Sequence, residues 1–313
     1  MEIFGSTFDD SVFEESREKP PVVALSSYNA KLCEAEWFCE SIDTEDILEK
    51  QKIFKFRADM AYRRKNFQEA LNAYTTCLSY IPEGNLTIRW DIMEGTARCF
   101  CHLGKRVEAL EITETLKKQA SNTCHLTSLL HLTANVHERF GDLRSQVTCL
   151  QQLCSLHPYH QWHWMKLAES YLHLLQSLST PSGSSPFQQG DGVEPQPDFQ
   201  TEEQLKAERD GVWLKACMCF VRARLLLRAL KGQQSSFVLQ NSERALQKAD
   251  EALRCLEPKD TTLQLISEVM SEDLVPERMR EDNQDGESLA GLSLKDFEDR
   301  WWNRLVQTEG GWT

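Results

Sequence analysis

The stretch Phe54–Leu78, FKFRADMAYRRKNFQEALNAYTTCL, decides the fold of this chain. The apolar residues of its first half recur at the spacing of one helix face: Phe54, Ala58, Ala61 and Tyr62. A polar turn at 64–66 follows, and the second half has an apolar face made of Ala70, Leu71, Tyr74, Cys77 and Leu78. Pro82 ends this second helix, because proline cannot continue it. The stretch therefore predicts two antiparallel helices joined by a short turn.

The same pattern returns further along the chain. A second pair spans 93–116 and a third spans 130–158, with turn glycines at Gly104 and Gly141. A fourth first helix follows at Trp164, which stands 34 residues after the start of the third pair. Helix pairs that repeat in this way stack on their neighbours and bury a continuous core. The fold class that we predict is therefore all-α, a solenoid of antiparallel helix pairs.

The period and the spacing of large, small and aromatic positions resemble those of the tetratricopeptide (TPR) family. The resemblance covers roughly 120 residues and is weakest over 130–158, where Gln146 replaces the expected small residue. It implies a TPR-like α-solenoid. The alternative is a set of four ordinary amphipathic helix pairs. The alanines, turns and prolines agree in phase between the pairs, which favours the repeat architecture.

We divide the chain into five segments. The acidic N-terminal segment 1–27 and the Ser-, Pro-, Gly- and Gln-rich loop 176–200, which has no helical periodicity, are both expected to be disordered. TPR-like helical repeats occupy 28–175, and helices that complete and cap the solenoid occupy 201–271. An acidic linker and a C-terminal amphipathic helix make up 272–313.

Three helices are expected in the completing and capping segment. A long helix from Glu202 to about Leu230 has an apolar stripe that needs a partner, and we interpret it as the displaced second helix of the fourth pair. Two further helices, near 235–256 and 260–271, would cover the open end of the stack.

Both ends of the chain leave two interpretations open. Apolar residues recur among the acids of the N-terminal segment: Phe4, Phe8, Val12 and Phe13. This segment either folds onto a partner as a docking motif or lies on its own domain. In the C-terminal helix, Trp301 and Trp302 either dock on the chain's own solenoid or anchor a partner, because adjacent tryptophans rarely stay in water.

Composition limits the class of protein and its compartment. The net charge of -13 argues against a general nucleic-acid binder, whose affinity depends on Lys and Arg. The start of the chain lacks the pattern of a signal peptide, so we expect the 11 cysteines to be reduced thiols in the cytoplasm or nucleus. No apolar run reaches about 18 residues, and we expect no membrane span.

The sequence contains no motif that indicates catalysis, a cofactor or a metal. His157, His160 and His163 flank Pro158, which interrupts helical spacing, and no C-x2-C pair lies nearby. Glycine-rich phosphate loops and nucleophile motifs are also missing from the sequence. We therefore expect no enzyme activity, cofactor or metal, and we interpret His131, with His137, as a residue of a helix interface.

In TPR stacks the first helix of each repeat lines a concave groove. Carried onto this chain, the resemblance implies a groove of mixed charge made of Lys55, Asp59, Tyr62, Glu94, Arg98, His131, Asn135, Trp162, Met165, Glu169 and Leu172. We expect Trp162 and Met165 to be exposed together as an apolar patch at one end. The alternative is that this face is merely solvated.

One TPR subfamily clamps the C-terminal carboxylate of chaperones with Lys, Asn and Arg side chains. Only Lys55 fits that set here, since the other positions hold Asp59, Gly95, Ser128 and Leu132. Asp59 and Glu94 would also repel a carboxylate. A chaperone clamp is therefore not expected.

Beyond the repeats, the chain is similar to an uncharacterised family of vertebrate chromosome-eight open-reading-frame proteins. The similarity is carried by FDDSVFEE at 8–15, AKLCE at 30–34, AYRR at 61–64, EALEI at 108–112, KLAE at 166–169 and LKAC at 214–217. It covers most of the chain outside 176–200 and 232–260. It implies a TPR-like helical fold and no established activity.

Our first hypothesis is a non-enzymatic adaptor that binds a peptide or helix from a protein partner in the groove. The alternative is a structural subunit of a larger intracellular complex, with its outer helices and its Trp-rich helix as the interface. An RNA-binding helical repeat is a remote third possibility that the net charge disfavours.

Overall fold

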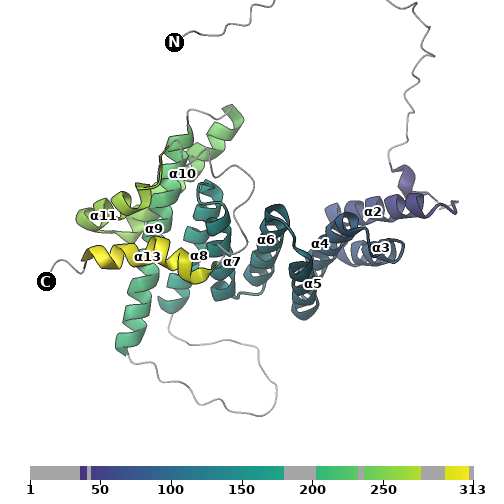
Figure 1. Ribbon diagram of the computed structural model, residues 1–313, viewed down its shortest axis with the longest axis horizontal. Coiled ribbons are helices and arrows are strands. Elements are labelled where there is room, and N and C mark those ends of the chain that lie inside the picture. The colour runs from purple at the N-terminus through teal and green to yellow at the C-terminus, as the bar shows by residue number, and fades with distance from the viewer. Residues whose placement is uncertain (1–35, 41–43, 180–201, 232–235, 276–292, 310–313) are drawn as a thin grey trace, which may run out of the picture. The chain divides into compact units, whose positions relative to one another are not determined.

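The computed structural model describes residues 36–40, 44–179, 202–231, 236–275 and 293–309, and these residues form helices and no strand (Figure 1). The all-α prediction is therefore confirmed for the described part of the chain. None of its helices is both long enough and apolar enough to cross a membrane.

The chain divides into two units, 1–43 and 44–313. In the first unit, residues 36–40 include a single 3-10 turn, η1 (Trp37–Cys39). The predicted N-terminal segment 1–27, positions 180–200 of the predicted loop and positions 276–292 of the predicted linker lie outside the described residues.

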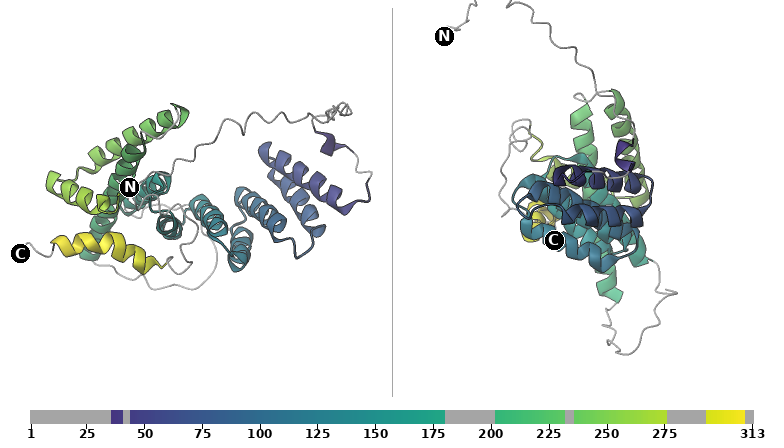
Figure 2. Two further views of the ribbon diagram at one scale, coloured as in Figure 1. Left: turned by 45° about the horizontal axis from the view of Figure 1, so that its top comes forward. Right: turned by 90° about the vertical axis from the view of Figure 1, so that its right-hand side faces the viewer.

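The second unit begins with seven consecutive helices among its described residues. They are α2 (Ile47–Arg63), α3 (Phe67–Ser79), α4 (Leu86–His102), α5 (Arg106–Gln119), α6 (Thr123–Arg139), α7 (Leu143–Leu156) and α8 (Gln161–Ser179). Each helix packs against the one that follows it (Figure 2). The predicted pairs are therefore present, and the first one starts at Ile47, before the apolar face at Phe54 begins.

One turn geometry joins the two helices of each of the first three pairs. Lys65, Gly104 and Gly141 have left-handed φ angles of 63°, 77° and 73°. In each turn the following N–H donates a hydrogen bond of 2.9 Å to a carbonyl five residues back: Asn66 to Ala61, Lys105 to Phe100, and Asp142 to His137. This arrangement satisfies carbonyls at the helix end, and it favours glycine because other residues pay about 1–2 kcal/mol in that conformation. The repeat is thus visible in the backbone.

A close approach between α3 and α4 positions a side chain of the predicted groove. A Cβ atom added at Gly95 of α4 would lie 2.7 Å from the ring of Tyr74, so the ring fits because glycine leaves that space. The Tyr74 hydroxyl donates a hydrogen bond of 2.7 Å to Asp59 on α2. Packing between the first two pairs therefore holds the Asp59 carboxylate in place.

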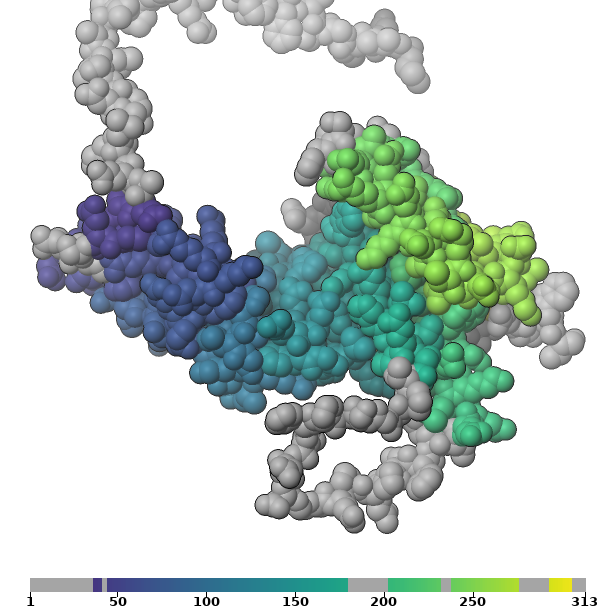
Figure 3. Space-filling model, turned by 180° about the vertical axis from the view of Figure 1, so that it is seen from behind, coloured from purple at the N-terminus to yellow at the C-terminus, as the bar shows by residue number. Residues whose placement is uncertain are grey.

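The long helix α9 (Glu202–Leu230) lies along α8, as expected for the displaced second helix of the fourth pair (Figure 2). Helices α10 (Ser236–Leu256) and α11 (Asp260–Ser271) pack on α9. In Figure 3 their green surface adjoins the teal surface of α7 and α8. These helices have nearly the bounds that the sequence predicts, because the apolar stripes and the starting residues are local signals.

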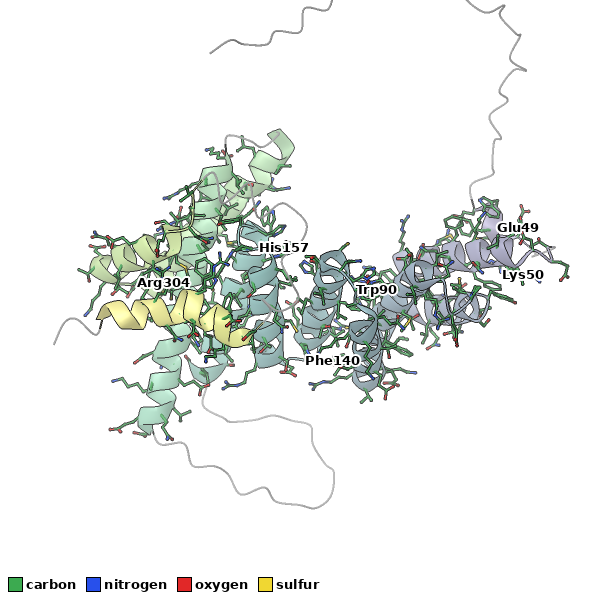
Figure 4. All side chains as sticks on the ribbon, in the orientation of Figure 1. Glu49, Lys50, Trp90, Phe140, His157 and Arg304 are labelled. Atoms are coloured by element: carbon green, nitrogen blue, oxygen red, sulfur yellow. The ribbon has the colours of Figure 1, made fainter. Side chains whose placement is uncertain are left out.

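Helix α13 (Leu294–Glu309) docks on the chain's own helices and contacts α7 and α11. Its buried face consists of Phe297, Trp301, Trp302 and Leu305, none more than 5% exposed. Trp301 meets the indole of Trp164 on α8 edge to face, with 5.1 Å between ring centroids. Arg304 points into the space between α13 and α11, where it pairs with Glu272 (Figure 4). Of the two interpretations of the tryptophan pair, docking on the own chain is confirmed.

The side chain of Arg222 on α9 is fully buried under α13. Its guanidinium donates hydrogen bonds to both carboxylate oxygens of Asp273 and to the carbonyls of Met270 and Pro158. It also lies 4.6 Å from the centroid of the Trp301 ring. A single cation thus joins α9, the end of α11, the α7–α8 turn and α13.

Candidate protein-binding groove

A groove with a volume of about 510 Å³ lies between α2, α4 and α6, the first helices of the first three pairs. Three of the predicted site residues line it together: Tyr62, Arg98 and Asn135. The remaining lining residues are Cys101, His102, Leu132, Val136, Glu138 and Arg139. The three residues, which the helical pattern puts on one face of each helix, therefore line one groove.

The floor of the groove is apolar and its walls are polar. Leu132 and Val136 are each only 1% exposed, whereas Asn135 on the same helix is exposed. On the opposite wall, the hydroxyl of Tyr62 lies 3.2 Å from Nε2 of His102. The ring of His102 stacks on Phe67 with 4.1 Å between centroids. The wall facing Asn135 is thus an aromatic surface held in place by packing.

Two arginines occupy one end of the groove. Arg98 donates hydrogen bonds through Nε and Nη2 to a single carboxylate oxygen of Glu94, one turn back on α4. Arg139, at the end of α6, has no hydrogen-bond or ion-pair partner among the described residues. Glu138 beside it is paired with Lys166 of α8. The acidic side chains nearby are thus engaged, while Arg139 is not.

The pKa values of two groups in the groove respond to these cations. Burial, together with the charges of Arg139 and Arg98, lowers the pKa of His102, which is therefore neutral at pH 7. Burial also raises the pKa of the Cys101 thiol, and the same two arginines only partly oppose this effect. Cys101 therefore stays a thiol and is a poor nucleophile.

The predicted residues Lys55 and Asp59 form a closed ion cluster on α2, about two turns and one turn before Tyr62. The ammonium of Lys55 lies 2.9 Å from Asp59 and 2.9 Å from Asp91 of α4. Burial alone would lower the pKa of Lys55, but its hydrogen bonds to the two carboxylates raise it. Two carboxylates thus share one cation and leave this end with a net negative charge.

His131 lies at the junction of α6 and α8 and does not line the groove. Its Nε2 is 3.0 Å from Nε2 of His163, whose ring stacks on His160 with 3.9 Å between centroids. Nε2 of His157, labelled at the α7–α8 turn in Figure 4, is 2.7 Å from the hydroxyl of Thr127. The interpretation of His131 as an interface residue is confirmed.

The four imidazoles of this junction are neutral at pH 7. Burial lowers the pKa of His131, His157 and His160, and burial with the three neighbouring imidazoles lowers that of His163 to about 2. In the described part of the chain, no group of three or more His, Cys, Asp or Glu side chains is arranged to hold a metal ion. The two facing nitrogens share one hydrogen, so one imidazole donates to the other.

The expected apolar patch at the α8 end of the groove is wrong. Trp162 is 38% exposed, but Met165 is only 4% exposed and belongs to the core. Leu172 is half-buried against the same core. Glu169 forms an ion pair of 2.6 Å with Lys248 of α10. Helices added after the repeats cover the face of α8 that is open on α2, α4 and α6.

Six lining residues were not among the candidates. Cys101 and Glu138 continue the candidate rows by one turn, after Arg98 and Asn135, and the other four are His102, Leu132, Val136 and Arg139. Each of these four lies one position from a row of residues that had been considered, since Val136 follows Asn135 and Leu132 follows His131. A groove between helices is lined by two adjacent rows of each helix. Extending each candidate row by one position would have found them.

Comparison with known proteins places the chain in a family without an assigned activity. The model of the family of unknown function DUF5588 matches residues 2–194 and 191–308. The Rattus norvegicus protein described as "Uncharacterized protein C8orf76 homolog" is 34% identical over 97% of this chain and 93% of its own length. The Homo sapiens "Uncharacterized protein C8orf76" is 35% identical over the same shares. The chain therefore belongs to the DUF5588 family, in agreement with the resemblance seen in the sequence.

Proposed function

We propose that this protein is a non-enzymatic scaffold that binds a peptide or helix of a partner protein in the groove between α2, α4 and α6. The observation that carries this proposal is the combination of surfaces in one groove. The exposed amide of Asn135 can both donate to and accept from a peptide backbone, and the buried Leu132 and Val136 close the groove beneath it. Arginine and tyrosine side chains complete the walls, and both residue types are enriched at protein interfaces.

The chemistry of the groove supports binding better than catalysis. Cys101 and His102 are its only thiol and imidazole among the described lining residues, and as neighbours on one helix they point about 100° apart. The raised pKa of the thiol also keeps it protonated. A base cannot activate a nucleophile in this arrangement.

A location in the cytoplasm or nucleus is part of the proposal. The ten cysteines in the described part of the chain are free thiols, and seven of them are buried or half-buried in helices. Thiols of this kind persist in reducing compartments.

The alternative of a complex subunit that uses its Trp-rich helix as an interface has less support. Trp301 and Trp302 are 3% and 5% exposed on the chain's own core, so they offer little surface to a partner. An RNA-binding role has no supporting observation beyond scattered basic residues, and the net charge is -13.

The test is affinity purification followed by mass spectrometry, with the full chain as bait. The groove variant is Asn135→Ala with Tyr62→Ala, which changes the walls and leaves the buried floor intact. The control is Val107→Ala with Glu111→Ala, at exposed positions on α5. We expect specific partners to be lost with the groove variant and kept with the control. If every partner survives the groove variant, the groove is not the binding surface.

A further inference from the structure

We propose that the groove takes an acidic peptide segment, in which an Asp or Glu side chain is held by Arg98 and Arg139. This inference rests on the proposed function and names the chemistry of the partner. It follows from the charges, the free donors and the polarity of the groove.

The balance of charge at the arginine end is positive, although the whole chain is strongly acidic. The carboxylates beside the groove are already compensated, Glu94 by Arg98 and Glu138 by Lys166. Arg139 has no compensating acid among the described residues. The surface therefore presents an unpaired cation next to a second one, and an anionic group on a partner complements it.

The same two cations act on two groups inside the groove. The charges of Arg139 and Arg98 contribute to the lowered pKa of His102 and act on the thiol of Cys101. The two side chains lie one after the other on α4 and face different directions. Because the cations act on both, their field extends through the space that a ligand would occupy.

The arginines have donors left for a ligand. A guanidinium carries five N–H donors, and Arg98 uses only Nε and Nη2 on Glu94. Nη1 of Arg98 is therefore available, and so is the entire guanidinium of Arg139. The pair with Glu94 also holds Arg98 in one orientation, which reduces the entropy lost on binding. A planar carboxylate can accept from such guanidinium groups in a bidentate manner.

The negative charge toward the start of α2 and α4 sets the direction in which the peptide binds. Asp59 and Asp91 share the single cation of Lys55, and they precede Tyr62 by one turn and Arg98 by two turns. This end repels carboxylates. The acidic residue of the peptide is thus directed to Arg98 and Arg139, away from the position where a chaperone clamp would bind its carboxylate.

Binding of synthetic peptides to the full chain tests the inference. Three fluorescein-labelled peptides of one length carry Leu and Phe between Asp and Glu, between Asn and Gln, or between Lys residues. A fourth has phosphoserine in place of the acids. Fluorescence anisotropy would measure each Kd at low and at raised NaCl. We expect the acidic peptide to bind about tenfold or more tightly than its Asn and Gln counterpart, with an affinity that falls as salt rises.

Arg139→Glu is the decisive variant, because it reverses the unpaired charge without removing an internal ion pair. The matched control is Arg244→Glu on α10, since Arg244 is also exposed and without a partner among the described residues. We expect Arg139→Glu to weaken the acidic peptide at least tenfold and Arg244→Glu to leave it unchanged. Circular dichroism and the melting temperature establish that both variants fold.

Each other outcome overturns the inference in a way that separates it from the proposed function. Equal binding of the acidic and the neutral peptide leaves the groove as a binding site but removes its preference for acids. Binding of only the phosphorylated or only the basic peptide assigns the groove a different partner. Equal binding to the wild type and Arg139→Glu places the peptide elsewhere. If no peptide binds, the acidic partner is rejected, and the affinity purification still decides whether the groove binds proteins.

Discussion

The face that is open on α2, α4 and α6 is closed on α8, although α8 is the first helix of a pair like the other three. In α2–α6, which we call the open region, two small clusters of buried side chains hold the pairs together and leave a groove. In α7–α13, which we call the closed region, the helices share one large cluster that extends from Leu126 of α6 to Leu305 and includes Met165. One repeat pattern therefore leaves an open groove or becomes part of a core, depending on which helices pack on it.

The histidine junction lies where the two regions meet. His131 lies on α6, the third of the helices that line the groove. His157 and His160 lie in the turn between α7 and α8, and His163 lies on α8. Lys166 of α8 also reaches across to Glu138 of α6. Any relative movement of the two regions therefore has to break contacts at this junction.

The largest loss of stability is expected from Arg222→Ala, a substitution that removes contacts only in the closed region. The variant leaves two carbonyls without their buried donor and the Asp273 carboxylate with only the more exposed Arg300, at 3.3 Å. Removing one partner of a buried ion pair costs about 3–5 kcal/mol, and because Arg300 remains, the free energy of unfolding in urea should fall by the lower end of that range. Hydrogen exchange should show the loss of protection in α7–α13, with α2–α5 keeping theirs.

The matched control is Arg228→Ala on the same helix. Arg228 is 54% exposed and lies 3.9 Å from Asp250, so its loss should cost less than about 0.5 kcal/mol. An equal loss of protection in α2–α5 and in α7–α13 would contradict the division of the molecule into an open and a closed region.

The open region was predictable because its features depend on residues close in sequence. Tyr62, Arg98 and Asn135 meet in the groove because helical periodicity determines which side of a helix they occupy. The turns at Gly104 and Gly141 follow from the preference of glycine for left-handed angles. Such local rules also gave the bounds of α9, α10 and α11.

The closed region was not predictable in the same way, because its contacts join distant parts of the chain. Met165 is buried in a core that includes helices beginning only after residue 201. Arg222 finds Asp273, which is 51 residues further along. Neither pairing leaves a periodic signal in the sequence, since each depends on how whole helices pack. The exposed patch of Trp162 and Met165 was therefore expected from a rule that holds only where nothing covers the repeats.

A smaller effect, dependent on pH, is expected at the histidine junction. The imidazole of His163 takes up a proton near pH 6.5 in the unfolded chain but only near pH 2 in the folded one, so the unfolded state binds more protons between these values. The stability that neutral His163 provides is therefore complete above pH 6.5 and is lost as the pH falls. The slope should approach about 1.4 kcal/mol per pH unit below 6.5 for each histidine held neutral.

Urea denaturation from pH 8 to pH 5 measures this slope, and His163→Gln provides the comparison. Glutamine stays neutral, so the variant should be less stable at pH 8 but lose less stability on acidification. His173→Gln, on the same helix but exposed, should follow the wild type. If wild type and His163→Gln had the same slope, the junction would not contribute to the acid sensitivity of the fold.

The smallest effect concerns the turns that the open region repeats. A Cβ atom at Gly104 would meet nothing within 4 Å, so the cost of Gly104→Ala comes from its left-handed φ of 77° alone and should be about 1 kcal/mol. Lys65 occupies the equivalent position with φ 63°, and Lys65→Gly should raise the free energy of unfolding by roughly 0.5 kcal/mol, since relief of strain exceeds the added flexibility of the unfolded chain. Thermal and urea unfolding of the two variants would measure opposite signs, because one turn geometry serves both pairs. If both substitutions destabilised, Lys65 would have to contribute through its side chain, and the equivalence of the two turns would be limited to their backbone hydrogen bonds.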